Sequence, residues 1–114
     1  MDYNAIKQEA QAKAKAVGQA FLDDYHHGHD AGMCGFAWVN IRLANKGNTK
    51  AGKEERKVLR AMGFELDWTG MEFQWWNPSG LGCQNVDAKA QGARAAAKVL
   101  QGYGFNAYAG SRLD

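Results

Sequence analysis

The segment MEFQWWNPSGLGCQNVDAKAQGARA, residues 71–95, contains the residue types best suited to binding chemistry. An aromatic strand pattern passes through a glycine loop into an alanine-rich helix pattern. A helix N-terminus offers unpaired backbone N–H groups and the positive end of the helix dipole, which favour an anion. The loop also supplies hydrogen-bonding side chains and glycines that permit close backbone approach, namely Ser79, Gly80, Gly82, Gln84 and Asn85. We predict an anion-binding loop; a plain turn is the alternative.

Arg112, in the C-terminal GSRLD, is a further candidate because it could bring positive charge to this loop. The loop has neither the lysine-bearing phosphate-loop pattern nor a dinucleotide fingerprint. The prediction therefore concerns a small anion in general and no particular phosphate chemistry.

The segment HHGHDAGMC gathers side chains that zinc accepts as ligands: His26, His27, His29, Asp30 and Cys34. Neither paired-cysteine spacing nor the helical HExxH spacing is present. A cysteine nucleophile with a histidine base would need a third group and an oxyanion site, which no pattern defines. We therefore predict no metal, cofactor or catalytic residue, and we expect Cys34 and Cys83 to be buried free thiols.

Hydrophobic periodicity predicts the elements that must position these residues. Residues 4–25 show the spacing of an amphipathic helix, and residues 34–43 alternate as a strand does. A helix reaching Met62 follows, with Gly63 as its stop, and a hairpin around Thr69 and Gly70 comes next. In that hairpin Phe64, Leu66, Trp68, Met71, Phe73 and Trp75 are expected to share one face. Asn85 is a plausible N-cap for a helix reaching Tyr103, and residues 105–109 predict a last strand.

After the first helix, the predicted order is strand, helix, strand, strand, helix, strand. This is the split βαβ order of a ferredoxin-like α+β sandwich, in which both crossover helices cover one face of a four-stranded antiparallel sheet. We expect one domain over residues 1–114, with an N-terminal helix in 1–30 and an α+β core in 33–114.

The other sheet face is predicted to be aromatic and polar. Its expected members are Phe36, Trp38, Arg42, Gln74, Trp76, Asn106 and Tyr108. RNA-recognition sheets stack bases on such aromatics, but their glycine-aromatic consensus is missing here. Glu65, Asp67 and Glu72 would also repel a phosphate chain, so nucleic acid is not favoured. Alternatively, the N-terminal helix or a second subunit covers this face.

Charge is unevenly distributed along the chain. Residues 31–63 contain seven basic and two acidic side chains, whereas residues 64–86 contain three acidic and no basic ones. This pattern suits a small anion better than a long duplex. No run approaches the about 20 apolar residues that cross a bilayer, and MDYNAIKQEA lacks the pattern of a secretory signal. We expect a cytoplasmic protein without a membrane partner.

The stretches GFAWVNI, WWNPSG, VDAKAQGARAAAKVL and SRLD together resemble a group of small accessory proteins encoded by bacteriophages. The resemblance covers most of residues 33–114 and brings no catalytic residues with it. It implies a protein that acts in the cytoplasm of an infected bacterium. Such proteins bind and inhibit host components, including by sequestering nucleotide signals used in antiviral defence.

The sequence thus predicts a non-enzymatic, homo-oligomeric protein that binds a small anionic, nucleotide-like ligand. Trp38, Trp76 and Arg42 would complete the loop site with stacking rings and charge. Three alternatives stay open. The aromatic face could bind a host protein or serve as a structural accessory, the sheet could bind single-stranded nucleic acid, or the chain could be a small metal or cysteine enzyme.

Overall fold

The computed structural model describes residues 2–26, 32–82 and 85–113. The elements in chain order are α1 (Tyr3–His26), β1 (Gly35–Arg42), α2 (Lys50–Ala61), β2 (Glu65–Leu66), β3 (Glu72–Trp76), α3 (Val86–Gly102) and β4 (Ala107–Leu113). One predicted helix stop and one predicted N-cap are confirmed. Gly63, with φ +88°, directly follows the C-cap of α2, and the Asn85 side chain caps α3 by accepting from the Ala88 N–H at 2.8 Å.

The strands form one four-stranded sheet in the order β2-β3-β1-β4, and every neighbouring pair is antiparallel. β1 lies inside the sheet, where Ile41 pairs with Phe73 on one side and Ala107 on the other. The predicted α+β class and four-stranded antiparallel sheet are therefore confirmed.

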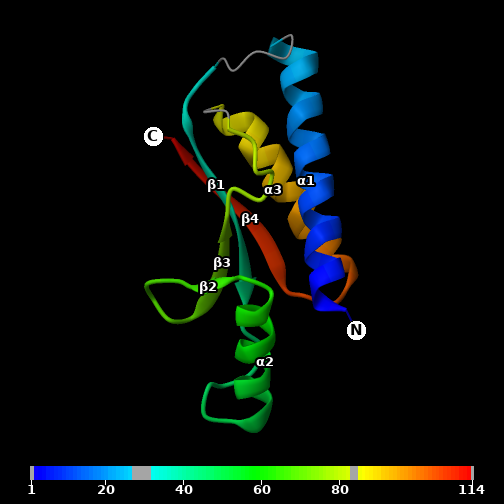
Figure 1. Ribbon diagram of the computed structural model, residues 1–114. Helices are drawn as coiled ribbons and strands as arrows, with labels where there is room; N and C mark the ends of the chain where they lie inside the picture. Colours follow the sequence, from blue (N-terminus) through cyan, green and yellow to red (C-terminus); the bar gives the residue numbers. More distant parts are fainter. Residues whose placement is uncertain (1, 27–31, 83–84, 114) are drawn as a thin grey trace.

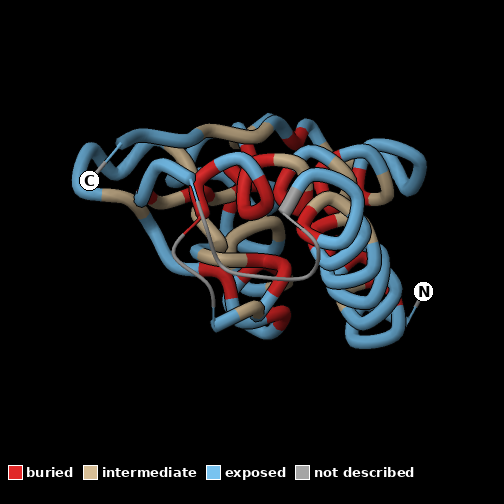
Figure 2. The backbone as a smooth tube through the Cα atoms, turned by 90° about the horizontal axis from the view of Figure 1, so that it is seen from above, coloured by how far each residue is buried: buried red, intermediate tan, exposed pale blue. Residues whose placement is uncertain are grey.

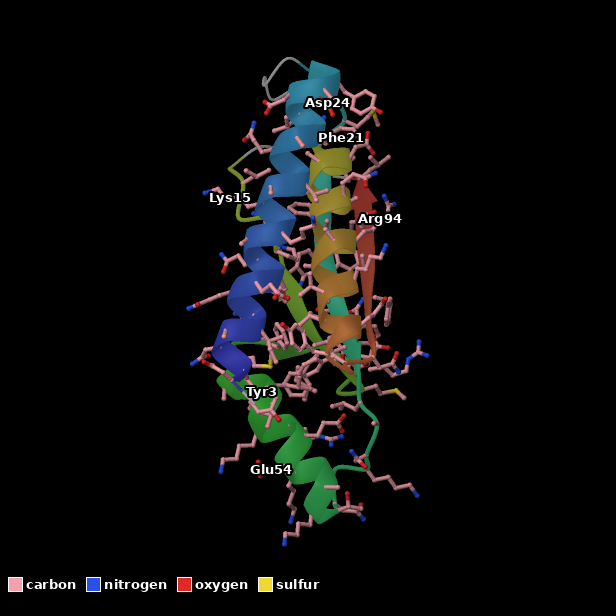
Figure 3. All side chains as sticks on the ribbon, turned by 90° about the vertical axis from the view of Figure 1, so that its right-hand side faces the viewer. Tyr3, Lys15, Phe21, Asp24, Glu54 and Arg94 are labelled. Atoms are coloured by element: carbon pink, nitrogen blue, oxygen red, sulfur yellow. The ribbon has the colours of Figure 1, made fainter. Side chains whose placement is uncertain are left out.

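Helices α1 and α3 lie side by side over one face of this sheet (Figures 1 and 3). Ala37, Val39 and Ile41 of β1 are buried on that face, together with alanines from both helices. The small side chains let the helix backbones approach closely. A Cβ added to Gly92 of α3 would lie 2.9 Å from the Ala14 carbonyl oxygen of α1. Figure 2 shows that the buried residues gather towards the middle of the molecule.

Helix α2 departs from the ferredoxin-like prediction. It extends beyond the end of the sheet, and α1 takes the place beside α3 that a second crossover helix would fill (Figure 1). The reason is that α2 offers little apolar surface along its length. Leu59, near its C-terminal end, and the C-cap Met62 are buried in the core, whereas its N-terminal turns consist largely of lysine and glutamate. After α1 the elements follow the order strand, helix, strand, strand, helix, strand, but the predicted ferredoxin-like arrangement, with both crossover helices over one face of the sheet, is not matched.

The position of α1 also decides one alternative raised by the sequence. Because α1 packs beside α3, it lies on the aliphatic side of the sheet, and none of the described helices covers the aromatic side. We call the sheet side opposite α1 and α3 the open face. No helix in the described parts of the chain has both the length and the apolar composition needed to cross a bilayer.

The β2–β3 hairpin is wider at its tip than predicted. Asp67 Oδ1 accepts from the Thr69 hydroxyl at 2.7 Å and from the Met71 N–H at 3.3 Å, which closes a loop before the strands can pair further. Phe73 of β3 is buried. Trp68 and Met71 are 96% and 72% exposed and lie in the loop between β2 and β3, outside the paired strands.

Candidate functional site

Three aromatic rings lie together on the open face. The register of β1 and β3 places Trp38 directly across from Trp76, with ring centroids 4.8 Å apart and an interplanar angle of 31°. Phe36 meets Trp76 edge to face at 6.2 Å. We call Phe36, Trp38 and Trp76 the aromatic platform. Rings on neighbouring strands attract each other in this geometry, so the platform is a joint product of β1 and β3.

Strand β4 provides the space that the platform needs. Gly110 pairs with Trp38, and a Cβ added to Gly110 would lie 2.7 Å from the Trp38 ring. The indole therefore lies directly over glycine backbone. Trp76 is 46% exposed, so one ring of the platform remains accessible to a ligand.

Arg112 of β4 brings positive charge to the same end of the open face. Its guanidinium carbon lies 5.4 Å from the centroid of the Phe36 ring and 6.0 Å from that of Trp76. No described carboxylate forms an ion pair with it. A guanidinium over aromatic rings is held by cation–π attraction, and its N–H donors remain available to an anion.

A hydrogen-bonded chain fixes the orientation of Trp76. Its indole Nε1 donates to Gln74 Oε1 at 3.2 Å, and Gln74 Nε2 donates to Asn40 Oδ1 at 3.1 Å. Asn40 is buried at 6% exposure. The Trp76 side chain is therefore already ordered before a ligand binds, so binding costs less conformational entropy.

At the other end of the open face, the positive charge of an arginine is paired with a carboxylate. Arg42 Nε lies 3.4 Å from a Glu72 carboxylate oxygen, and the Tyr108 hydroxyl donates to the other oxygen of that carboxylate at 2.5 Å. The hydrogen bond to Glu72 raises the pKa of Tyr108 above its ordinary value. Arg42 lies on the predicted face, but its charge is already paired.

The predicted anion loop lies on the helix side of the sheet instead. Ser79 is 1% exposed, and its hydroxyl donates to Asn77 Oδ1 at 3.1 Å. Asn85 is equally buried as the cap of α3. Gly80 is exposed with φ +65°, and a Cβ there would lie 3.8 Å from Gln11 Nε2 of α1. Gly82 is also exposed, while Gln84 lies outside the described residues.

The predicted site residues thus form two groups. Trp38, Trp76 and Arg112 come together on the open face, and Arg42 lies farther along it. Ser79, Gly80 and Asn85 belong to a loop that is wedged against α1 and α3, where Leu81 packs near Leu22 and Ala88. No protein family, curated protein or solved structure matches this chain.

Sequence reasoning placed Phe36 on the open face but did not choose it as a ligand residue. It missed Gly110, because the role of a strand glycine becomes clear only once its cross-strand neighbour is known.

Sequence reasoning also missed a pocket of about 480 Å³ between α2 and the α3–β4 turn, lined by Tyr3, Val58, Tyr103 and Phe105 among others. One of its carboxylates, Glu55, already accepts from the backbone N–H groups of Ala44 and Asn45.

The structure describes some of the residues named in the metal and thiol predictions. Within the described ranges, no three His, Cys, Asp or Glu residues are grouped as a metal site would require. His27, His29 and Asp30 lie outside those ranges, as does Cys83. Cys34 is a free thiol but is exposed, so its expected burial is wrong.

Proposed function

We propose that the aromatic platform and Arg112 bind a small anionic ligand with a planar ring, of the nucleotide class, without catalysing a reaction. The observation that carries the proposal is the cross-strand Trp38–Trp76 pair, with an arginine at its rim, on a sheet face that no described helix covers. Stacking of a base on an aromatic side chain contributes about 1–3 kcal/mol. A hydrogen bond to a charged group contributes about 1.5–3 kcal/mol more.

The two parts of such a ligand match the two parts of the site. The planar ring stacks on the exposed surface of Trp76, whose indole N–H is already held by Gln74. The phosphate accepts from the Arg112 guanidinium, which has planar donors suited to two phosphate oxygens. Arg112 gives up its contact with Phe36 and Trp76, and an exposed cation–π contact is worth only about 0.5–1 kcal/mol.

The charges on the open face favour a small ligand over a long strand. Beyond the platform, the positive charge of Arg42 is compensated by Glu72, and the exposed Glu65 pairs in register with Gln74. A polynucleotide running along this face would bring further phosphates towards carboxylates, which repel them. One nucleotide-sized ligand avoids that cost.

The biological role that we propose follows from the resemblance to phage-encoded accessory proteins. A protein that holds a nucleotide without turning it over lowers its free concentration in proportion to the protein present. In the cytoplasm of an infected bacterium, that activity would withdraw a nucleotide signal used in antiviral defence.

Tryptophan substitution tests the proposed site. Calorimetric titration with AMP, ADP, GMP and cyclic mono- and dinucleotides should show binding of at least one of them. Trp76→Ala should weaken that binding by roughly five-fold to a hundred-fold, because one stacked ring is lost. Trp68→Ala is the matched control, since Trp68 is 96% exposed at the hairpin tip and lies outside the platform.

Two results would contradict the proposal. One is that no member of the panel binds the parent protein at millimolar concentration. The other is that Trp76→Ala and Trp68→Ala bind equally well. Either result would favour the alternative in which the exposed aromatic residues contact a protein.

A further inference from the structure

The outer edge of β4 is an unprotected sheet edge. β2, at the opposite edge of the sheet, has only two residues, whereas β4 runs over seven and pairs with β1 in unbroken register. Monomeric proteins usually protect such edges with proline, bulges, short strands or covering elements. Ala107–Leu113 contains no proline, and in Figure 3 no described element flanks its outer side.

The hydrogen-bond pattern identifies which groups point outward. The Arg42 N–H donates to the Asn106 carbonyl at 3.0 Å, and antiparallel pairs alternate between bonded and non-bonded positions. Tyr108, Gly110 and Arg112 therefore direct their backbone groups to β1, and the intervening residues direct theirs outward. Gln101 Nε2 donates to the Ala107 carbonyl at 2.7 Å, which agrees with this assignment.

Gln101 occupies only the first outward carbonyl of the strand. The outward backbone groups of Ala109, Ser111 and Leu113 have no hydrogen-bond partner in the described structure. Ser111 and Leu113 are exposed. Backbone donors and acceptors in this row are spaced to pair with another extended strand.

We propose that β4 of a second copy of this chain occupies the edge, antiparallel and centred on Gly110. In this register, Ala109 of each copy exchanges hydrogen bonds with Ser111 of the other. The interface is isologous, because the same residues serve on both sides of a twofold axis.

Side chains of β4 favour a second copy over an unrelated strand. Centring on Gly110 places Tyr108 of each copy across from Arg112 of the other, on the open face. Directly opposed Cβ atoms lie about 4.5–5.5 Å apart, within reach of a guanidinium–ring contact. The two Arg112 side chains lie towards opposite ends of the strand pair and therefore stay apart. On the helix side, Ala109 opposes Ser111 and Ala107 opposes Leu113, so each pair contains at least one small side chain.

The dimer would join the two sheets into one and bring both aromatic platforms onto a single surface. Only this consequence rests on the proposed function, since the edge pairing itself does not involve the ligand. Two adjacent platforms would suit a ligand with two bases, such as a cyclic dinucleotide.

Substitution at Ser111 tests the dimer. Ser111→Pro removes an outward N–H and leaves the bonds to β1 intact, as a proline on an edge strand does. Ser111→Thr, the matched control, keeps the N–H and suits a strand. Sedimentation from about 5 to 500 µM covers weak specific interfaces. The parent and Ser111→Thr should sediment as dimers at the upper end, and Ser111→Pro as a monomer.

Amide hydrogen exchange provides a test without any substitution. In the parent protein, the amides of Ala109 and Ser111 should exchange more slowly at high than at low protein concentration, whereas those of Tyr108 and Gly110 should not change. A monomer over the whole range, a Ser111→Pro dimer as stable as the parent, or unprotected outward amides would overturn the proposal. Nucleotide titration of monomeric Ser111→Pro shows separately whether the platform binds, so failure of one proposal is distinguishable from failure of the other.

Discussion

Two arginines on the open face differ in whether their positive charge is already paired, and this decides which of them is available to a ligand. Arg42 lies beside Glu72, and its guanidinium carbon lies 5.5 Å from the centroid of the Tyr108 ring. Hydrogen bonding to Tyr108 and then to Glu72 raises the pKa of Arg42, because both interactions favour its charged form. Arg112 contacts only aromatic rings among the described ionic and ring interactions. A ligand phosphate therefore gains more from Arg112 than from Arg42.

The corresponding prediction compares the two arginines. Arg112→Ala should weaken nucleotide binding by roughly ten-fold to a hundred-fold, because a charge-assisted hydrogen bond worth about 1.5–3 kcal/mol is lost. Arg42→Ala should change the affinity by less than about three-fold, because the charge of Arg42 is already compensated by Glu72 and its loss removes little attraction for the ligand phosphate. Calorimetry at two salt concentrations measures both effects. Equal losses in the two variants would show that the phosphate is not held at the Arg112 end.

For single residues, the sequence predicted which side chains lie on the open face better than it predicted which of them lie close together. Alternation along β1 correctly placed Trp38 and Arg42 on one side. Arg112 was assigned to the glycine loop because the last strand was predicted to end at residue 109. β4 continues to Leu113, and this extension carries Arg112 over Phe36 and Trp76. Strand ends depend on tertiary pairing, which single-sequence patterns do not contain.

The β2–β3 hairpin depends on one carboxylate. Asp67 accepts from the Thr69 hydroxyl and from the N–H groups of Met71 and Glu72. The hydrogen bond from Thr69, followed by those from the backbone, lowers the pKa of Asp67. A carboxyl group whose folded pKa is depressed contributes stability above its unfolded pKa, and that contribution disappears as pH falls through the folded pKa.

We therefore predict that acid loosens the hairpin tip. Below about pH 4, the ordinary range of aspartate, the amide resonances of Met71 and Glu72 should shift with the Asp67 carboxyl as it titrates. Asp67→Asn keeps an acceptor oxygen without the titrating group, so these shifts should be absent. Nuclear magnetic resonance titration measures both. An Asp67 pKa at or above that of a model peptide would contradict the prediction.

Among the elements, α2 shows where sequence patterns lose information. Its end was predicted well, since Gly63 directly follows its C-cap. No cap was predicted for its start, where Thr49 accepts from the Gly52 N–H at 3.0 Å. Its place was not predicted. The order of elements suggested a crossover helix over the sheet, but α1 presents Ile6, Ala10 and Ala14 as a longer buried stripe. Competition between helices for one sheet face is decided by packing, which the order of elements does not specify.

The whole molecule depends on the close contact between α1 and α3. Gly18 of α1 and Gly92 of α3 lie where added Cβ atoms would approach neighbouring groups to 2.9 Å. For Gly92 these neighbours are the Ala14 carbonyl oxygen and the Ser79 Cβ, and neither can rotate away. The same contact positions the buried loop at Ser79, so the loop predicted to bind an anion also packs against both helices.

Gly92→Ala is therefore predicted to destabilise the protein even though alanine is the better helix former. Helix propensity alone would stabilise the variant by about 0.5–1 kcal/mol, whereas overpacking costs about 1–3 kcal/mol. Gly102→Ala, in the same helix, is the matched control because an added Cβ there meets nothing within 4 Å. Urea unfolding should show a net loss of roughly 1–2 kcal/mol for Gly92→Ala, and no loss for Gly102→Ala. If Gly92→Ala is as stable as the parent, the helices can separate without cost and the interface is not tightly packed.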